Sequence, residues 1–189
     1  MTSFSKREAE RALAELDMTA ANRALCDHWL SLWPGDALPP RAAIAPARLK
    51  PYLPNIMLMD TVPDRSVTIR LAGTRIVSSL KTELTGQDWV ALAPKSYRAK
   101  RLRNYSAVAR GAVVVGHRRV PLTFEQYNVC EEILLPFAPD QNGIYPVLVH
   151  LDWKPLAYTE VESVPDALGA PTDTKIITLR KISARASAA

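Results

Sequence analysis

Residues 67–86 constrain the fold of this chain more than any other stretch. Apolar Val67, Ile69 and Leu71 alternate with polar residues, and a period of two is typical of a strand with one buried face. Gly73 follows almost directly and ends the pattern. We therefore expect a strand here whose three apolar side chains share one face and point into a core.

Two helix starts follow this strand. Thr74 stands in the position of an N-cap for a helix over residues 74–80. Thr85 precedes Asp88 by three residues, a spacing that lets the hydroxyl cap a second helix over 86–92 while the carboxylate lies in its first turn. One strand thus leads into two short helices, which we expect to lie across a sheet.

The rest of the chain supplies further strands and one long helix. Strand patterns cover residues 55–60, 113–119, 124–137 and 145–153, and a helix pattern covers 95–110. Residues 139–143 are a strong turn signal between the last two of these strands. Residues 175–182 alternate weakly, as one more strand or a segment that pairs with another chain would. We predict an α+β fold with a five-stranded antiparallel sheet, flanking helices and an N-terminal helical extension.

Two helices are expected ahead of the sheet. The first starts at the capping box of residues 5–8, and the second runs to about Trp33. The second helix has an apolar face with spacings of three, four and seven, made of Leu25, Trp29, Leu32 and Trp33. This face packs either on its own domain or on a second copy of the chain. We take the four residues as dimer-contact candidates.

The composition is that of a globular chain. Its 189 residues are most simply one domain with extensions, and no apolar run approaches the roughly 20 residues that a membrane span needs. The N-terminal residues lead into a charged amphipathic stretch in place of an apolar signal core, so we expect no export, a cytoplasmic location and no membrane partner. The net charge of +5 is compatible with acidic partners but does not require them.

Cys26 and Cys130 are the two cysteines, and they fall in a predicted helix and a predicted strand. They are either a redox pair or two small buried hydrophobes, and we favour the second interpretation because a cytosolic disulfide is rare. The two cysteines and three scattered histidines lack the short paired spacings of closed metal sites. We expect no metal centre.

Several short motifs occur in a fixed order along the chain. Trp29 and Trp33 come first, then a run from Leu38-Pro39-x-Arg41 to Leu53-Pro54, then R-L-A-G-T-R-I at 70–76 with L-T-G at 84–86, and finally E-I-L-L-P-F at 132–137. Together they resemble the PAS sensory domain, in particular a bacterial single-domain PAS group of alphaproteobacterial type. The resemblance covers roughly residues 23–153.

The resemblance divides the chain into three parts. Residues 1–22 are an N-terminal helical extension, residues 23–154 are the PAS-like domain, and residues 155–189 are a Pro-rich connection with a further strand and a loose tail. The leading helices of PAS domains often dock on a second copy, so the resemblance implies a homodimer.

The resemblance also implies a ligand cavity beneath the short helices and the connecting helix. The residues that we expect to line it are Leu71, Ile76, Trp89, Leu102, Tyr105, Val129 and Ile133. Haem sensors of this fold present a histidine from the connecting helix, and flavin photosensors present a cysteine from the helix after the second strand. Residues 95–110 contain no histidine and residues 74–92 contain no cysteine. The cofactor is therefore unknown, with haem and flavin disfavoured.

The function that the resemblance implies is regulatory. Such a module binds a small-molecule ligand or docks on a signalling protein partner, without catalytic output of its own. A basic nucleic-acid-binding regulator is an alternative that would use residues 95–119, including Arg101 and Arg103. A charge run is more often a solvated face, so nucleic acid is disfavoured as a partner.

A small enzyme is the remaining alternative. It would use Glu131, His150 and Asp152, which a hairpin of the last two strands would bring together. Such a group more often forms a cross-strand ion pair than a catalytic centre. We therefore expect no enzymatic activity.

Overall fold

The computed structural model describes the backbone of residues 5–123, 126–155 and 171–178, and the side chains of residues 5–117 and 130–153. Its helices are α1 (Lys6–Ala14), α2 (Ala20–Ser31), α3 (Pro46–Leu49), α4 (Thr74–Leu80) and α5 (Lys95–Ala109), with 3-10 turns η1 (Arg41–Ala43) and η2 (Leu53–Asn55). Its strands are β1 (Ile56–Val62), β2 (Ser66–Ala72), β3 (Ala112–Thr123), β4 (Gln126–Pro136), β5 (Tyr145–Pro155) and β6 (Pro171–Thr178).

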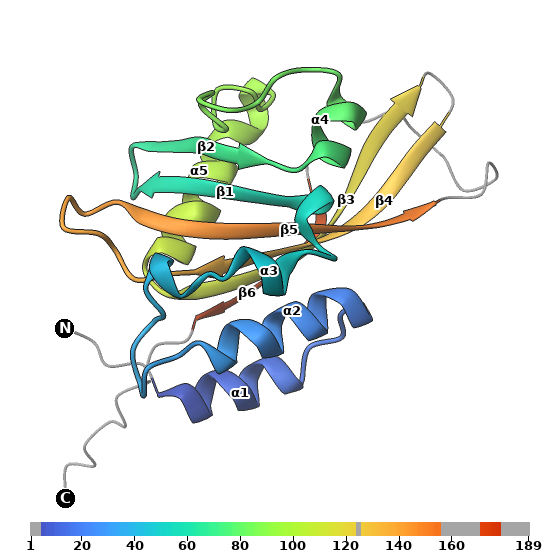
Figure 1. Ribbon diagram of the computed structural model, residues 1–189. Helices are drawn as coiled ribbons and strands as arrows, with labels where there is room; N and C mark the ends of the chain where they lie inside the picture. Colours follow the sequence, from blue (N-terminus) through green and yellow to red (C-terminus); the bar gives the residue numbers. More distant parts are fainter. Residues whose placement is uncertain (1–4, 124–125, 156–170, 179–189) are drawn as a thin grey trace, which may run out of the picture.

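The described strands form one antiparallel sheet in the order β2-β1-β5-β4-β3-β6 (Figure 1). The five expected strands are all present, and the α+β prediction is confirmed. β6 adds a sixth strand that pairs with β3 and starts four residues before the weak alternation at 175–182. It therefore extends the chain's own sheet.

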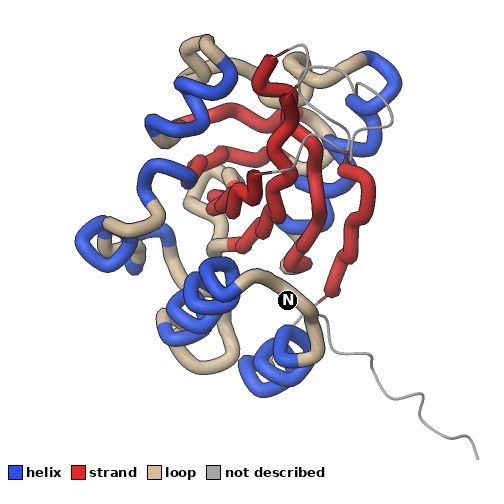
Figure 2. The backbone as a smooth tube through the Cα atoms, turned by 90° about the vertical axis from the view of Figure 1, so that its right-hand side faces the viewer, coloured by secondary structure: helices blue, strands red, loops and turns tan. Residues whose placement is uncertain are grey.

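Helices cover both faces of this sheet (Figures 1 and 2). We call the face under α1, α2 and α3 the outer face and the face under α4 and α5 the inner face. Strand residues alternate between two separate buried clusters: Ile56 and Leu148 lie with the outer helices, whereas Met57 and Val149 lie with the inner ones. A period of two with apolar residues on both faces is typical of a strand covered on both sides.

The predicted helix over 86–92 is wrong. These residues form turns whose backbone pairs with the free edge of β2: the Trp89 amide donates to the Val67 carbonyl at 2.8 Å, and the Gly86 amide donates to the Ile69 carbonyl at 2.7 Å. Gly86 has a φ of +84°, which is incompatible with a helix start. The segment thus pairs with the exposed edge of the sheet in place of forming a continuous helix.

Gly73 is the point at which the outer and inner coverings meet. It is the N-cap of α4 in place of the predicted Thr74, which is the first helical residue. A Cβ atom at Gly73 would lie 2.3 Å from the carbonyl oxygens of both Leu53 and Pro54. The Gly73 amide also donates to the Ile56 carbonyl at 2.8 Å. Two motifs that lie far apart in the sequence therefore cross here, and only glycine fits the crossing.

Within the described residues, no helix is both long enough and apolar enough to cross a membrane.

Candidate functional site

Four of the seven predicted cavity residues lie together between the inner face and helices α4 and α5. Ile76, Trp89 and Tyr105 are buried members of the inner cluster, and Leu102 packs against it. They come from α4, from the turns that follow it and from α5. The sequence prediction thus brought the correct segments together, because short helices after β2 have no other apolar surface on which to pack.

The structure adds a buried arginine to this group. We expected Arg101 among the exposed basic residues of α5, and this was wrong: Arg101 is 1 % exposed. Its guanidinium carbon lies 4.2 Å from the centre of the Trp89 ring and 5.4 Å from that of Tyr97. Its Nη1 donates to the Trp89 carbonyl at 2.6 Å. The aromatic rings of Trp89 and Tyr97 make this position favourable for a cation.

Arg101 connects two parts of the inner covering. The segment 84–94 lies along the edge of β2, and Arg101 holds its middle to α5 through Trp89. Arg98, one turn earlier on α5, donates to the carbonyls of Ala91 and Ala93 at 2.7 and 2.9 Å. The two arginines therefore fix the segment on α5 through backbone carbonyls. A charged group inside an apolar layer is costly unless it is paired in this way.

Leu71 does not belong to the inner cluster. A β-bulge shifts the register, so that Met59 pairs with Ile69 but Leu58 pairs with Leu71. A shift of one residue moves each later side chain to the other face of the sheet. Leu71 therefore lies on the outer side beside Leu58 and is 41 % exposed. The alternation in the sequence was real, but the bulge at Arg70 could not be read from it.

Ile133 also faces away from the predicted cavity. It is buried in the outer cluster, whereas its neighbour Leu134 belongs to the inner one. The run of apolar residues in β4 gave no period, so the sequence could not say which residues face which side. Val129 pairs with Arg119 of β3 and Lys154 of β5 along the backbone, and its side chain lies outside the described part.

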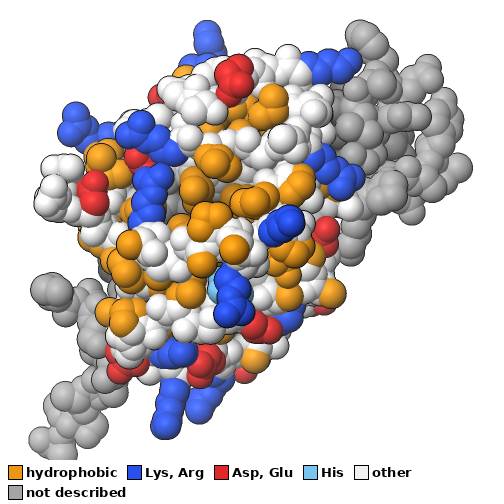
Figure 3. Space-filling model, viewed as in Figure 1, with side chains coloured by type: hydrophobic (Ala, Val, Ile, Leu, Met, Phe, Trp, Pro, Cys, Tyr) orange, Lys and Arg blue, Asp and Glu red, His pale blue; other side chains and the backbone are white. Residues whose placement is uncertain are grey.

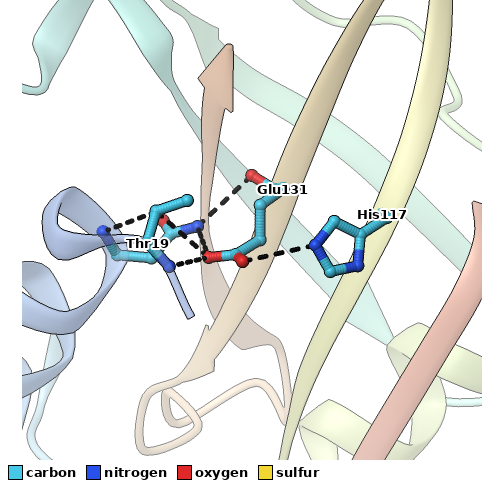
Figure 4. A network of polar contacts seen from close by, with 4 residues as sticks. Thr19, His117 and Glu131 are labelled. Atoms are coloured by element: carbon cyan, nitrogen blue, oxygen red, sulfur yellow. Dashed lines mark hydrogen bonds and ion pairs between the residues drawn. The ribbon is translucent and has the colours of Figure 1, made fainter. Parts of the chain in front are cut away.

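The outer face has a polar network that joins α2 to the sheet (Figure 4). Glu131 Oε1 accepts hydrogen bonds from the Thr19 amide at 2.8 Å, from the Thr19 hydroxyl at 3.1 Å and from Asn22 Nδ2 at 2.8 Å. Its Oε2 lies 3.4 Å from His117 Nε2. Thr19 is the N-cap of α2, and its hydroxyl accepts from the Asn22 amide. One buried carboxylate thus binds the N-terminal end of a helix, where a negative charge is stabilised.

Asn22 extends the network to β5. Its side-chain nitrogen donates to Glu131, so its Oδ1 faces His150 Nδ1 at 2.7 Å and His150 is the donor. Tyr52 lies edge-on to the His150 ring with the centroids 5.4 Å apart. Burial lowers the pKa of His150 to about 4, against the opposing charges of Asp152 and Glu131. His150 is therefore neutral at pH 7 and acts as a hydrogen-bond donor.

A protein-family model with the description PAS domain matches residues 18–148, well over half of the chain. The chain belongs to the PAS-domain family. Neither the comparison with curated proteins nor that with solved structures found a match.

The matched range runs from the N-cap of α2 to β5 and includes both layers of the PAS domain. It contains the crossing at Gly73, where the L-P and A-G-T motifs of the sequence touch. It also contains Arg41 and Arg70, which come from two of the motifs and bind the same carboxylate of Asp60 at 3.2 and 2.5 Å. These contacts give a physical reason for motif residues that are far apart in sequence.

The four dimer-contact candidates pack on the PAS domain itself. Leu25, Trp29 and Trp33 are buried in the outer cluster, and Leu32 packs against it. The Trp29 ring donates to the Pro136 carbonyl at 2.9 Å, and the two tryptophan rings meet edge to face with centroids 5.1 Å apart. Of the two interpretations of this face, the structure supports packing on its own domain. Their role in a dimer stays a prediction.

The residues of the enzyme alternative lie in the network and its surroundings. Glu131 pairs with Asp152 across the strands, and His150 pairs with Ile133, two residues along each strand. Glu131 and His150 are 3 % and 2 % exposed because α2 covers them. Their hydrogen bonds position α2, which gives these two residues a structural role. Sequence reasoning missed Asn22, although a polar residue on the sheet-facing side of an amphipathic helix is a signal that could have found it.

The two cysteines of the PAS domain are not placed to form a redox pair. Cys26 lies in the outer cluster and Cys130 in the inner cluster, on opposite faces of the sheet, and neither forms a disulfide. Burial raises the pKa of Cys26 to about 12, which leaves it protonated and unreactive. Among the described residues, no group of three or more His, Cys, Asp or Glu is placed to hold a metal ion.

Proposed function

We propose that this PAS domain is a sensory and regulatory module that binds a small ligand in its inner layer and has no catalytic output of its own. The family match supports a sensory or regulatory role at the level of the domain. The ligand, and its place between the inner face of the sheet and α5, are our proposal.

The observation that carries the proposal is the buried Arg101 between Trp89 and Tyr97. Binding sites for small molecules are mostly apolar with a few well-placed polar groups. Here the apolar part is the inner cluster, and the polar group is a guanidinium whose position is fixed by two rings and a backbone carbonyl. This combination suits a ligand that has an aromatic or aliphatic body and one acceptor group.

The same contacts suggest how occupancy would be reported. The segment 84–94 is held to α5 through the carbonyls that Arg101 and Arg98 bind. A ligand that takes hydrogen bonds from Arg101 would compete with the Trp89 carbonyl and change the balance between two positions of this segment. A ligand shifts such a balance only by its difference in affinity for the two positions.

The test is native mass spectrometry of the purified protein, with an absorption spectrum of the same sample. We expect a retained small-molecule mass that is lost in Arg101→Met and kept in the matched variant Arg103→Met, which changes an exposed residue two positions away on α5. Hydrogen exchange in 84–94 should then differ between loaded and empty protein. An empty wild type, or a ligand that survives Arg101→Met, would overturn the proposed site. A visible band would identify a coloured cofactor.

A further inference from the structure

Two large apolar side chains are exposed among the described residues, Leu53 at 37 % and Leu71 at 41 %. Leu71 is exposed because the bulge in β2 turns it out of the inner cluster. Bulges commonly redirect a side chain next to a functional surface. The bulge exposes a leucine that the alternation of β2 would otherwise bury. An apolar side chain exposed without a gain in stability is most expected at a functional or strained site.

The two leucines belong to one surface. Leu71 pairs with half-buried Leu58, and the backbone of Leu53 lies against Gly73, two residues beyond Leu71. The leucine patch, as we call it, consists of these residues and the exposed prolines beside Leu53: Pro51, Leu53, Pro54, Leu58 and Leu71. Figure 3 shows this outer side, where apolar side chains gather in the middle with Lys and Arg among them.

The charged residues in the two chain segments that form the leucine patch are almost exclusively basic. Residues 37–59 contain Arg41, Arg48 and Lys50 and no acidic residue, and residues 65–82 are also free of acidic residues. Arg41, Arg48, Lys50 and Arg70 are exposed. The nearest carboxylate, Asp60, is buried and already bound by Arg41 and Arg70. The patch is thus apolar in the centre with a basic rim.

We propose that the leucine patch docks an acidic amphipathic helix of a partner protein. The apolar face of such a helix would cover the leucines, and acidic residues beside that face would meet Arg48 and Lys50, since Arg41 and Arg70 are already paired with Asp60. The inference deepens the proposed regulatory function, on which it rests, by giving the partner's chemistry and the surface that it binds.

Other occupants fit this surface less well. Leu53 and Leu71 are more than half covered by their own surroundings, so they are not projecting groups that could insert into a lipid bilayer. A nucleic acid would have to give up its hydration where it covers the apolar centre of the patch. None of the five patch residues has an aromatic ring on which a base could stack. In the described part of the chain, α1 buries its apolar residues Ala9 and Leu13, and α5 contains no acidic residue. Within the described residues, a second copy therefore offers no acidic helix with an exposed apolar face.

The experiment is selection from a displayed library of helical peptides, with the full-length protein as target and Leu53→Asn/Leu71→Asn as counter-target. Both changes are at exposed positions, and circular dichroism should show an unchanged fold. We expect enriched peptides with apolar residues at i, i+3, i+4 and i+7 and Asp or Glu beside them. Their Kd should rise at least about tenfold on the double Asn variant.

Charge reversal tests the rim. Arg48→Glu/Lys50→Glu should weaken the selected peptides about fivefold at low salt, and added salt should reduce the difference. Lys95→Glu/Arg103→Glu on α5 makes the same change in net charge at another surface and should leave the Kd unchanged. Peptides that are basic, that bind the double Asn variant equally, or that do not emerge at all would overturn the inference.

Two further probes decide the occupant. Sedimentation with vesicles of phosphatidylserine and phosphatidylcholine, and titration with duplex DNA, should show no effect of the double Asn variant. If the double Asn variant lost binding to the vesicles or to the DNA, that probe, and not a protein helix, would identify the occupant of the leucine patch. Native mass spectrometry separates the two proposals. If a ligand is retained but no peptides are selected, the proposed function stands and the docking surface is rejected. If peptides are selected but no ligand is retained, the docking surface stands and the proposed ligand site is rejected.

Discussion

The two coverings of this sheet are held in different ways. On the outer face, α2 is fixed by a chain of hydrogen bonds from Thr19 and Asn22 to Glu131 and His150, and by the Trp29 ring on a backbone carbonyl. On the inner face, the turns that follow α4 are held to β2 by backbone hydrogen bonds and to α5 by arginines that bind their carbonyls. One covering is a regular helix fixed by a buried side-chain network; the other includes a segment of turns fixed by an edge strand and by two arginines.

This difference indicates which side of the molecule can respond to a ligand. A fully satisfied polar network allows one position of a helix on a sheet, because any shift leaves buried groups unpaired. The segment 84–94 is joined to α5 by carbonyls that bind Arg98 and Arg101, and a ligand acceptor can replace such a carbonyl. We therefore expect the inner covering to change with occupancy and the outer one to stay in place. Four experiments test this difference between the two coverings.

Gly73→Ala should have the largest effect, because it acts on the joint between the two coverings. The new Cβ would lie 2.3 Å from two backbone oxygens that cannot both move. We expect a loss of about 4 kcal/mol in the free energy of unfolding, measured by urea denaturation, or a failure to recover folded protein. Gly143→Ala is the control. Gly143 has a φ of +73°, but a Cβ atom added there would meet no atom within 4 Å, so we expect a loss of about 1 kcal/mol in the free energy of unfolding. Equal costs would show that the crossing at Gly73 is not tight.

Acid should destabilise the outer covering through His150. Its pKa is lowered from 6.5 to about 4 in the folded protein, so the unfolded chain takes up the proton first as the pH falls. The contribution is fully present above about pH 6.5 and is lost progressively down to about pH 4, by about 3 kcal/mol in total. Urea denaturation between pH 7 and pH 4 should show this slope in wild type and a smaller one in His150→Gln. The same slope in both would assign it to other groups.

Asn22→Ala should remove the link between β4, β5 and α2. It leaves Glu131 and His150 each without one buried partner, and we expect a cost of about 2 kcal/mol in the free energy of unfolding. Asp27→Ala, on the exposed side of the same helix, should change stability by less than about 0.5 kcal/mol. Hydrogen exchange should rise in α2 and not in 84–94. A rise in both segments would mean that the two coverings are not independent.

Arg101→Lys should have the smallest effect on stability, about 1 kcal/mol, since it keeps the charge but loses the planar group that stacks on Trp89 and Tyr97. The intrinsic fluorescence of Trp89 should change, and hydrogen exchange should rise in 84–94 with α2 unaffected. Arg103→Lys, exposed on the same helix, should change neither. Faster exchange in α2 on Arg101→Lys would contradict the separation of the two coverings.

The sheet and its long helix were predictable because each rests on a local signal. Alternation marked β2, a short apolar run marked β1, the turn signal at 139–143 marked the hairpin of β4 and β5, and the helix pattern over 95–110 marked α5. The second short helix was not, because Gly86 and the edge of β2 together favour pairing over a helix. A capping pattern describes what a segment can do alone and carries no information about a free strand edge beside it.

The candidate site was predictable only in part, for a similar reason. Ile76, Trp89, Leu102 and Tyr105 follow from which segments must pack on the inner face. Leu71 and Ile133 were assigned to the wrong face because a bulge and an unbroken apolar run both remove the period that tells the faces apart. Arg101 was taken for a solvent-exposed charge because its burial depends on Trp89, twelve positions earlier.

The sequence by itself determined the PAS family, the antiparallel sheet and the segments that cover it, since these depend on motifs and on periods within single elements. Only the tertiary structure decided which charges are buried. Glu131, Arg101 and Asp60 look like surface residues in the sequence, yet each lies inside because partners from distant segments satisfy it. The cost of burying a charge is set by those partners, and partners exist only once the chain has folded.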